Sequence, residues 1–275
     1  MSAFRTARLG PVLLAGIVTL SACSSGAPDA ADPAGEVETA SATGAEGLAA
    51  LLAEGQAIFG VFSGPMTQEQ GQAIVAQQEA DFILYSMESG PFDLDGMRAY
   101  MQGMSEGAAA QGVPAQPVWL RIPAIHLDPE TAATRVADAL EAGVAGIVFP
   151  HVQTADEAVA SVESMGSPWP LGDSGLDVLI VEDQEGIANV RDIVATQGLS
   201  IVTAGPGDLR RAYEGDMEAV EAAIQAVLAA CLEFDVACGV TAGVDDIAMR
   251  LDQGFRMIIV TQPEALAVGR AHMGR

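Results

Sequence analysis

The stretch Val178-Leu179-Ile180-Val181-Glu182 is an apolar run of strand length that ends on a carboxylate. Further runs of this kind occur along the chain, and helical periodicity separates each run from the next. Near-continuous apolar strands are typical of a parallel sheet that helices cover on both faces. Eight strand–helix repeats favour closure over an open doubly wound sheet, so the predicted fold class is α/β, a (β/α)8 TIM barrel.

The predicted strands share an apolar composition, and each is followed by a helical pattern. They cover residues 58–62, 82–87, 118–122, 146–149, 178–182, 200–204, 237–241 and 257–261. A lead-in helix over 47–54 precedes them, and Thr154 and Asp216 stand where helix N-caps are expected.

Two carboxylates follow consecutive strands of this predicted barrel. Glu182 ends the fifth run, and Asp208 ends the segment Gly205-Pro206-Gly207-Asp208 after the sixth. Because the loops after barrel strands converge on one face, both side chains are expected in the same shallow cavity. Oxygen ligands predict Mg²⁺ or Mn²⁺, whereas zinc usually recruits imidazole or thiolate as well. The alternatives are an exposed strand-end carboxylate for Glu182 and a helix N-cap for Asp208.

The beginning of the chain has the pattern of an export signal. Arg5 and Arg8 precede an apolar run over 9–20, which leads into Leu20-Ser21-Ala22-Cys23. This ending resembles a bacterial lipoprotein box, which implies a signal peptide over 1–22 and lipidation of Cys23. The resemblance implies an exported protein, anchored by lipid to a membrane of the bacterial cell envelope. A single-pass helix is less favoured, because the run is shorter than the roughly 20 residues that span a bilayer.

The rest of the chain divides into a tether and one domain. Residues 23–44 are rich in small and acidic residues and lack apolar periodicity, so a disordered tether is expected there. Residues 45–275 then agree in size with a single barrel of typically about 250 residues.

The net charge of the 275-residue chain and its lack of lysine each exclude one class of function. With 12 basic against 37 acidic residues the formal net charge is −25, so nucleic acid is not an expected partner. All the basic residues are arginine. Schiff-base aldol catalysis, which requires a lysine amine, is therefore excluded.

Two further cysteines, Cys231 and Cys238, lie late in a predicted helix and at the start of the next strand. In an exported protein they could form a disulfide. Two buried thiols are the equal alternative, since the spacing does not ensure that their Cα atoms approach within about 7 Å.

Segments in a fixed order carry a more specific pattern. They are DFILYSMESGPFD over 81–93, PVWLRIP over 117–123, AGVAGIVFPHVQTADEA over 142–158, Val181-Glu182, and GPGDL over 205–209. Together they resemble the HpcH/HpaI aldolase and citrate lyase family over about residues 55–270. The resemblance implies a metal-dependent barrel of the phosphoenolpyruvate/pyruvate type. Members make or break a carbon–carbon bond next to a 2-oxo acid, or act on acyl-CoA thioesters.

The resemblance also implies roles for particular residues. Glu182 and Asp208 would bind a divalent ion, namely Mg²⁺, Mn²⁺ or Co²⁺. Arg121 would lie beside the keto oxygen and stabilise the enolate, unless it simply pairs with a neighbouring acid. The backbone N–H groups near Gly207 and Asp208 would receive the substrate carboxylate. A homo-oligomer is a further implication.

The chain departs from the family pattern after the second strand. An aspartate and a histidine that act there as an acid/base pair are replaced by Ser86 and Ser89. Serine cannot take a proton at neutral pH unless a base or metal activates it, so Ser89 is a catalytic candidate only with such help. His151, at the end of the fourth strand, is the candidate replacement, with a polar packing role as its alternative. Glu88 lies beside the missing histidine, and His126, after the third strand, is a further candidate.

Three hypotheses follow. The chain is a metal-dependent carbon–carbon lyase of the class II aldolase type, with an altered acid/base group, acting on a 2-oxo acid or related carboxylate. Alternatively, it is a catalytically impaired barrel that binds a small carboxylate at the envelope, or a purely structural surface lipoprotein. The last would not need Arg121, Glu182 and Asp208 together.

Overall fold

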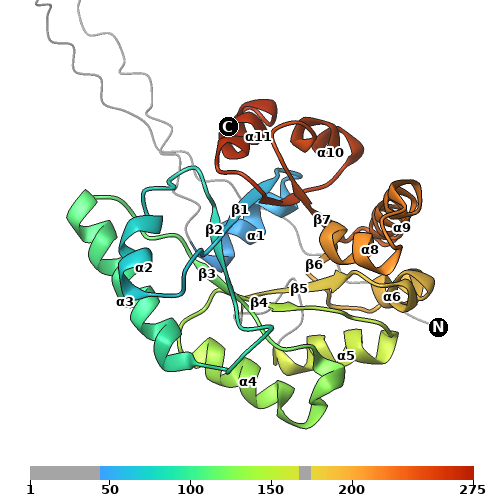
Figure 1. Cartoon of the computed structure of the whole chain (residues 1–275), viewed down its shortest axis with the longest axis horizontal. Helices are drawn as coiled ribbons and strands as arrows, with labels where there is room; N and C mark the ends of the chain where they lie inside the picture. Colours follow the sequence, from blue (N-terminus) through green and yellow to red (C-terminus); the bar gives the residue numbers. More distant parts are fainter. Residues whose placement is uncertain (1–43, 167–174) are drawn as a thin grey trace, which may run out of the picture. The chain divides into compact units, whose positions relative to one another are not determined.

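The computed structural model describes residues 44–166 and 175–275, which form a closed barrel of eight parallel strands (Figure 1). Each strand pairs with its neighbour in sequence, and β1 pairs with β8 to complete the ring. The predicted (β/α)8 barrel is confirmed. The predicted signal peptide over 1–22, the lipidated Cys23 and all but the last residue of the 23–44 tether lie outside the described residues.

The strands are β1 (Ile58–Phe62), β2 (Phe82–Ser86), β3 (Val118–Arg121), β4 (Gly146–Phe149), β5 (Leu176–Val181), β6 (Ile201–Ala204), β7 (Ala237–Ala242) and β8 (Met257–Val260). The helices are α1 (Ala45–Ala53), α2 (Gln68–Ile74), α3 (Leu94–Gln111), the 3₁₀ helix η1 (Ile125–Leu127), α4 (Pro129–Glu141), α5 (Ala155–Ser164), α6 (Gln184–Ala188), α7 (Val190–Val194), α8 (Pro206–Ala212), α9 (Met217–Phe234), α10 (Ile247–Gln253) and α11 (Glu264–His272).

The observed boundaries change the setting of the two predicted metal ligands. Strand β5 ends at Val181, so Glu182 is the first residue of the following loop and not the last residue of the strand. Asp208 lies in the first turn of α8. The side chains of Thr154 and Asp216 accept hydrogen bonds from the first turns of α5 and α9, which confirms both predicted N-caps.

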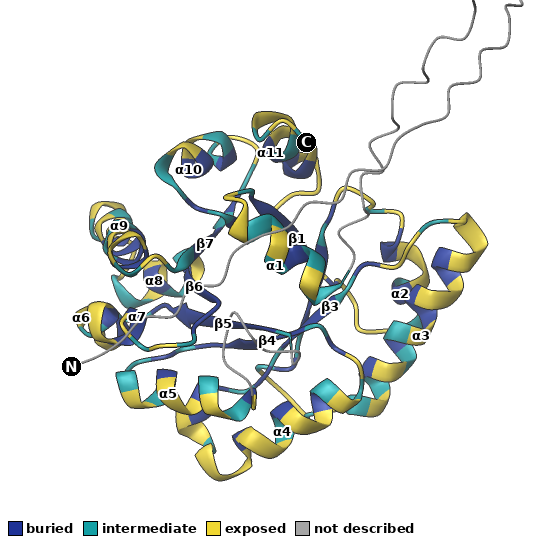
Figure 2. Cartoon of the chain, turned by 180° about the vertical axis from the view of Figure 1, so that it is seen from behind, coloured by how far each residue is buried: buried dark blue, intermediate teal, exposed yellow. Residues whose placement is uncertain are grey.

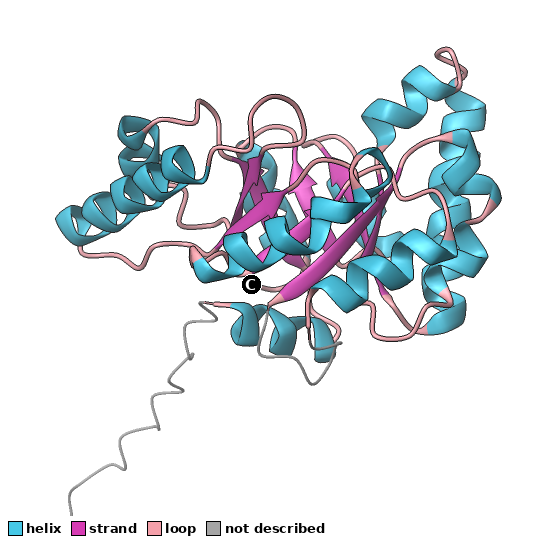
Figure 3. Cartoon of the chain, turned by 90° about the horizontal axis from the view of Figure 1, so that it is seen from below, coloured by secondary structure: helices cyan, strands magenta, loops and turns pink. Residues whose placement is uncertain are grey.

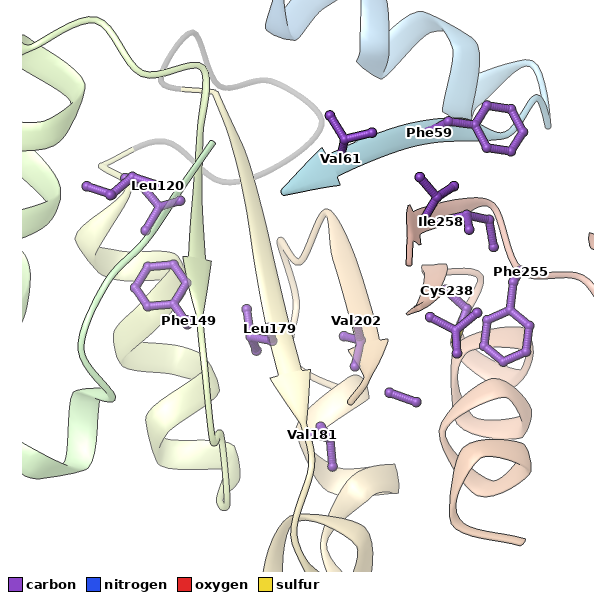
Figure 4. Packing of buried hydrophobic residues seen from close by; sticks show 14 of the residues in the cluster. Phe59, Val61, Leu120, Phe149, Leu179, Val181, Val202, Cys238, Phe255 and Ile258 are labelled. Carbon is purple, nitrogen blue, oxygen red and sulfur yellow. The ribbon is translucent and has the colours of Figure 1, made fainter. Parts of the chain in front are cut away.

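Alternation along the strands creates two apolar layers. One set of side chains points into the barrel, where the rings of Phe82 and Trp119 stack with centroids 3.9 Å apart. The other set packs against the surrounding helices, as Phe149, Leu179 and Val202 do in Figure 4. Figure 3 shows the helices around the strands, and in Figure 2 their buried sides face the sheet. Strands buried on both faces explain the near-continuous apolar runs of the sequence.

Cys231 and Cys238 belong to the outer apolar layer, between α9 and β7. Both are buried free thiols, and the Cys231 Sγ lies 3.7 Å from the carbonyl oxygen of Val202, to which it donates. Of the two alternatives that the sequence left open, the structure has buried thiols.

The carboxylate of Asp81, just before β2, ties the end of the described chain to the barrel. It accepts the backbone N–H of Phe59 at 2.9 Å. Arg270 on α11 lies 2.9 Å from it and Arg275 lies 2.7 Å from it. Because its side chain is only 8% exposed, Asp81 is a buried charge compensated by two guanidinium groups.

Among the described helices, none combines the length and the apolar character that crossing a bilayer requires.

Candidate functional site

Four charged or titratable side chains lie at, or just after, the carboxyl ends of four consecutive strands. Arg121 is the last residue of β3, and Glu182 directly follows β5. Glu88 lies two residues beyond β2, and His151 lies two residues beyond β4. Because these strands are parallel neighbours, their carboxyl ends bring the four side chains to the same end of the barrel.

The guanidinium group of Arg121 is held by two groups that follow or end β2. Arg121 is in register with Ser86 on the neighbouring strand, and its Nε donates to the Ser86 Oγ at 2.9 Å. Its Nη2 lies 3.0 Å from the Glu88 Oε2. The neighbouring acid considered as a partner for Arg121 is therefore Glu88, and Ser86 fixes the direction of the guanidinium plane.

His151 occupies a backbone conformation that most residues avoid. Its φ of 51° lies in the left-handed region, where His, Asn and Asp are found more often than other non-glycine residues. This turn points the His151 backbone N–H at the Glu182 Oε1, 3.2 Å away. Local strain of this kind persists where the surroundings fix it, and it concentrates at functional sites.

The imidazole ring of His151 lies between two carboxylates. Its Nε2 is 3.4 Å from the Glu88 Oε1, and its Nδ1 is 3.6 Å from the Glu182 Oε1. The hydrogen bond to Glu88 raises the pKa of His151 and lowers the pKa of Glu88, which the charge of Arg121 also lowers. Glu88 is thus the link between the guanidinium group and the imidazole.

Glu182 is the buried member of the group, with 3% of its side chain exposed. Burial raises the pKa of Glu182 to about 7, with the charge of Asp208 adding to the rise and that of His151 opposing it. Among the described residues, the one hydrogen bond that its carboxylate accepts comes from the His151 backbone. A Cβ at position 205 would overlap this carboxylate, so Gly205 leaves the space that Glu182 occupies.

These observations fit a divalent cation. Glu88, His151 and Glu182 each offer one ligand atom, and the three atoms lie within 4.8 Å of one another. A buried carboxylate with a single hydrogen bond needs compensation, which a bound cation provides. The described residues therefore provide ligand atoms for a metal ion, and they include a buried negative charge that a bound cation would compensate.

The structure sets Asp208 slightly apart from this group. Its carboxylate pairs with Arg211, one turn further along α8. Its charge nevertheless acts on Glu182 and His151, so it lies within electrostatic reach of both. The N-cap of α8 is Gly205, and Asp208 does not cap the helix. The expected sharing of an ion by Glu182 and Asp208 stays a prediction.

The comparisons with known proteins agree with this geometry. Residues 59–262 match the sequence profile described as HpcH/HpaI aldolase/citrate lyase. The chain belongs to the HpcH/HpaI aldolase/citrate lyase family. The resemblance that its motifs suggested is therefore confirmed, and the family is one of lyases that includes aldolases.

Similar proteins in this family carry aldolase names. A hydroxypyruvate/pyruvate aldolase of Paraburkholderia phytofirmans is 25% identical over 243 residues, which are 77% of this chain and 89% of the relative. A 2-dehydro-3,6-dideoxy-6-sulfogluconate aldolase of Pseudomonas putida is 24% identical over 70% of this chain and 81% of its own. The crystal structure of a family protein from Burkholderia cenocepacia J2315 superposes with a TM-score of 0.65 and 21% identity. It covers 82% of this chain and 95% of that one, and it shares the fold.

The remaining predicted site residues of this HpcH/HpaI chain lie around the group. Ser89 is exposed, and among the described residues it makes no hydrogen bond to Arg121, His151 or Glu182. Gly207 shares the first turn of α8 with Asp208. The catalytic role of Ser89 and the substrate-binding role of Gly207 stay predictions.

The contact of Glu88 with Arg121 and His151 is the part of the site that the sequence analysis did not predict. The sequence marks Glu88 only by its place beside the missing histidine. The signal for the contact was the alternation of side chains: Ser86 points to the same side as Arg121, and residue 88 is two positions further along. Extending the pattern of β2 past its end would have placed this carboxylate beside Arg121.

Proposed function

We propose that this chain is a divalent-metal-dependent carbon–carbon lyase of the aldolase type that acts on a 2-oxo acid or a related carboxylate. The observation that carries the proposal is the gathering of Arg121, Glu88, His151 and Glu182 at one end of the barrel. Membership of an aldolase/citrate lyase family and the aldolase names of similar proteins support it.

Arg121 would stabilise the enolate that forms when the bond next to the keto group breaks. The planar fork of donors on a guanidinium group suits an oxyanion. Ser86 fixes the orientation of the group through Nε, while a substrate oxygen would compete with Glu88 for Nη2. A divalent ion, when bound, supplies Lewis-acid polarisation of the keto oxygen.

Glu182 and Asp208 are proposed to hold this ion, which would be Mg²⁺, Mn²⁺ or Co²⁺. The low exposure of Glu182 supports a permanent ligand role for it. Asp208 would have to exchange its contact with Arg211 for the ion. The backbone N–H groups of Gly207 and Asp208 would then receive the substrate carboxylate.

A lyase of this type could cleave an aldol or decarboxylate a 2-oxo diacid. These two reactions differ in their need for a base. Aldol cleavage begins with removal of a hydroxyl proton, and with Ser86 and Ser89 in place of the usual pair the candidate carriers are His151 and Glu88. Decarboxylation of a 2-oxo diacid begins with loss of carbon dioxide, so it needs no base for its first step. We therefore expect decarboxylation to be the more robust activity.

The test is an assay of the chain with a panel of 2-oxo acids and 4-hydroxy-2-oxo acids, each with Mg²⁺, Mn²⁺ or Co²⁺. The proposal expects pyruvate to be released from at least one substrate and the release to stop when a chelator removes the ion. No release from any substrate with any of these ions would contradict it.

A second candidate is a barrel that binds a small carboxylate without turnover. Two observations favour it: the ion pair that Glu88 forms with Arg121, and the serines that stand in place of the acid/base pair. Calorimetry with pyruvate and oxaloacetate distinguishes the two candidates, because binding without product formation supports the binding protein alone.

We also propose that the protein is exported and held at the bacterial envelope through a lipid on Cys23, and that the barrel assembles as a homo-oligomer. The basis is the lipoprotein-like ending at residues 20–23. Metabolic labelling with a fatty acid tests it, since the Cys23→Ala variant should lose both the label and recovery in the membrane fraction.

A further inference from the structure

We propose that Phe62 determines substrate specificity: it receives the far end of the substrate and selects 2-oxo acids that end in an aromatic or aliphatic group over those that end in a second carboxylate. The inference rests on the function proposed above and deepens it, since it names the substrate class of the same site. Phe62 is the last residue of β1, the strand that pairs with β2.

The alternation of side chains along β1 directs Phe62 into the mouth of the barrel. Phe59 and Val61 belong to the outer apolar layer, which packs against the helices (Figure 4). Gly60 faces the interior, since a Cβ there would overlap the interior ring of Phe82. Phe62 is two positions beyond Gly60 and therefore also faces inward. Because it ends the strand, its side chain is 44% exposed and not buried.

Phe62 lies within reach of a substrate bound at Arg121. It is in register with Leu84 of β2. Ser86, two residues further along β2, accepts the Nε of Arg121. Neighbouring strands are about 4.8 Å apart and two residues advance a strand by about 6.6 Å, so the Cα atoms of Phe62 and Ser86 are about 8 Å apart. A substrate that spans this separation can place its keto oxygen at Arg121 and its far end on the phenyl ring.

The loop after Phe62 is held in place from three sides. The backbone N–H of Ser63 donates to the carbonyl oxygen of Leu84 at 2.9 Å. The carbonyl oxygen of Ser63 accepts the hydroxyl group of the buried Tyr100 at 3.0 Å and the side-chain amide of Gln70 at 3.2 Å. A single exposed apolar side chain is ordinary on a protein surface, but this one is fixed at the mouth of the site. A preorganised contact loses less conformational freedom when a ligand binds.

The arc of the rim around Phe62 offers no basic residue to a second carboxylate. This arc consists of the ends of β7, β8 and β1 with the loops that follow them, and the structure describes all of its residues, which are 241–246, 261–264 and 62–67. None of them is basic, whereas Asp245, Asp246 and Glu264 are acidic. Acidic groups repel a carboxylate, and an aromatic ring gains from contact with an apolar group. The far end of the substrate is therefore expected to be uncharged.

In the cleavage of such a 4-hydroxy-2-oxo acid, the bond between C3 and C4 breaks. The C4 hydroxyl group gives its proton to a base, and C4 with its oxygen becomes the carbonyl group of an uncharged aldehyde. The electron pair of the broken bond stays in the enolate at C2 and C3, which takes up a proton at C3 to give pyruvate. Phe62 would contact only the substituent on C4, so it acts on binding and not on the bond changes.

Calorimetric titration of the full chain with two 2-oxo acids, in the presence of Mn²⁺, tests the proposal without turnover. The compound 2-oxo-4-phenylbutanoate ends in an aromatic ring and 2-oxopentanedioate ends in a carboxylate. Neither carries the C4 hydroxyl group that cleavage requires. We expect the Kd of the phenyl compound to be lower by at least about tenfold. Equal affinities, tighter binding of the diacid, or no binding of either compound would overturn the proposal.

Two variants of Phe62 test whether its apolar character sets the preference. We expect Phe62→Gln to reduce the preference for the phenyl compound to less than about threefold, and Phe62→Leu, which stays apolar, to keep most of it. A parallel loss of both affinities in Phe62→Gln would indicate a structural role and overturn the proposal.

The matched control is Leu232→Gln. Leu232 is also an exposed apolar side chain, at 63%, but it lies in the last turn of α9, which leads to the start of β7 at the other end of the barrel. Its replacement should leave both affinities unchanged. Equal thermal unfolding of the variants and the unaltered chain excludes misfolding as the cause.

Pyruvate release from 4-hydroxy-2-oxo-4-phenylbutanoate and from 4-hydroxy-2-oxopentanedioate extends the test to cleavage. We expect kcat/KM to be at least about tenfold higher for the phenyl substrate. Phe62→Gln should lower it mainly through a higher KM, because the ring would contact the substrate equally in the ground state and the transition state. A binding preference without any release of pyruvate would leave this inference intact and contradict the proposed lyase. Release from both substrates with equal kcat/KM would overturn this inference and leave the lyase intact.

Discussion

Arg121 and Glu88 form an ion pair of 3.0 Å across the ends of β3 and β2, with Ser86 holding the Nε of the same guanidinium group. Both side chains are about one fifth exposed, so the pair is accessible to a ligand and yet partly desolvated. A substrate carboxylate or enolate would compete with Glu88 for Arg121. The strength of this competition sets how readily an anionic substrate enters.

Arg121→Lys tests the role of the guanidinium fork. Lysine keeps the charge but cannot donate to Ser86 and to a second acceptor in one plane. In the pyruvate-release assay we expect kcat to fall by about 10²–10³, the usual cost of losing one oxyanion donor. Arg98→Lys is the control, since Arg98 pairs with the exposed Asp95. An unchanged kcat in Arg121→Lys would show that this fork does not contact the reacting atoms.

Gly103→Ala tests the close packing of α2 on α3. A Cβ at position 103 would overlap the backbone carbonyl oxygen of Gln68 in α2. Although alanine normally stabilises a helix by up to about 1 kcal/mol over glycine, we expect a loss of about 1–3 kcal/mol in the free energy of unfolding. Urea denaturation measures it. Ser105→Ala, at an exposed position of α3, should stabilise the fold by no more than about 0.5 kcal/mol, and a stabilised Gly103→Ala would contradict the observed packing.

Asp81→Ala tests the contact between α11 and the barrel. Removing the carboxylate leaves Arg270 and Arg275 without their anion and the Phe59 N–H without its acceptor. Breaking a buried ion pair on one side usually costs about 3–5 kcal/mol, which a thermal or urea denaturation would reveal. Asp95→Ala removes an exposed pair and should cost less than about 1 kcal/mol. Similar losses in both variants would refute the importance of the burial.

Asp177→Asn tests a buried charge away from the site. Asp177 on β5 accepts hydrogen bonds from the backbone and side chain of Ser200, and its second oxygen has no partner among the described residues. Burial raises the pKa of Asp177 from an ordinary 3.8 to about 6. The ionised form therefore destabilises the fold by roughly 3 kcal/mol above pH 6, and the destabilisation disappears as the pH falls toward 4.

The asparagine variant removes this pH dependence. We expect Asp177→Asn to be more stable than the unaltered chain at pH 8 by about 1–3 kcal/mol, and the difference to close as the pH is lowered through 6. Urea midpoints at pH 8, 6 and 4.5 measure the difference. A gap that stays constant with pH would mean that the pKa of Asp177 is the same in the folded and the unfolded chain, so that burial does not raise it.

The sequence predicts most of the barrel because its strands are buried on both faces. The runs over 58–62 and 146–149 coincide with β1 and β4, where apolar residues stop at the strand ends. The sequence places the end of β5 one residue too late, because Glu182 directly follows the apolar run. In the structure the pairing of β5 with β6 ends at Val181. The identity of the strands follows from composition, but their ends depend on pairing with neighbours.

The candidate site is predicted only in part. Arg121 and Glu182 follow from their positions at strand ends, and His151 from its place after β4. His151 contacts both carboxylates from a left-handed backbone conformation, which no pattern of residue types encodes. Tertiary packing sets this conformation. The contact between Asp208 and Arg211, in contrast, joins residues three apart on α8 and is local.

The four clustered residues come from the ends of β2, β3, β4 and β5, and Asp208 follows β6, so the proposed chemistry lies on one arc of the rim. On the opposite arc, the last residue of β1 is Phe62, whose side chain is 44% exposed, and the loops after β7 and β8 begin with Gly243 and Thr261. Protein engineers could therefore graft new loops onto this arc to recognise different acceptors, and the reacting groups across the rim would stay untouched.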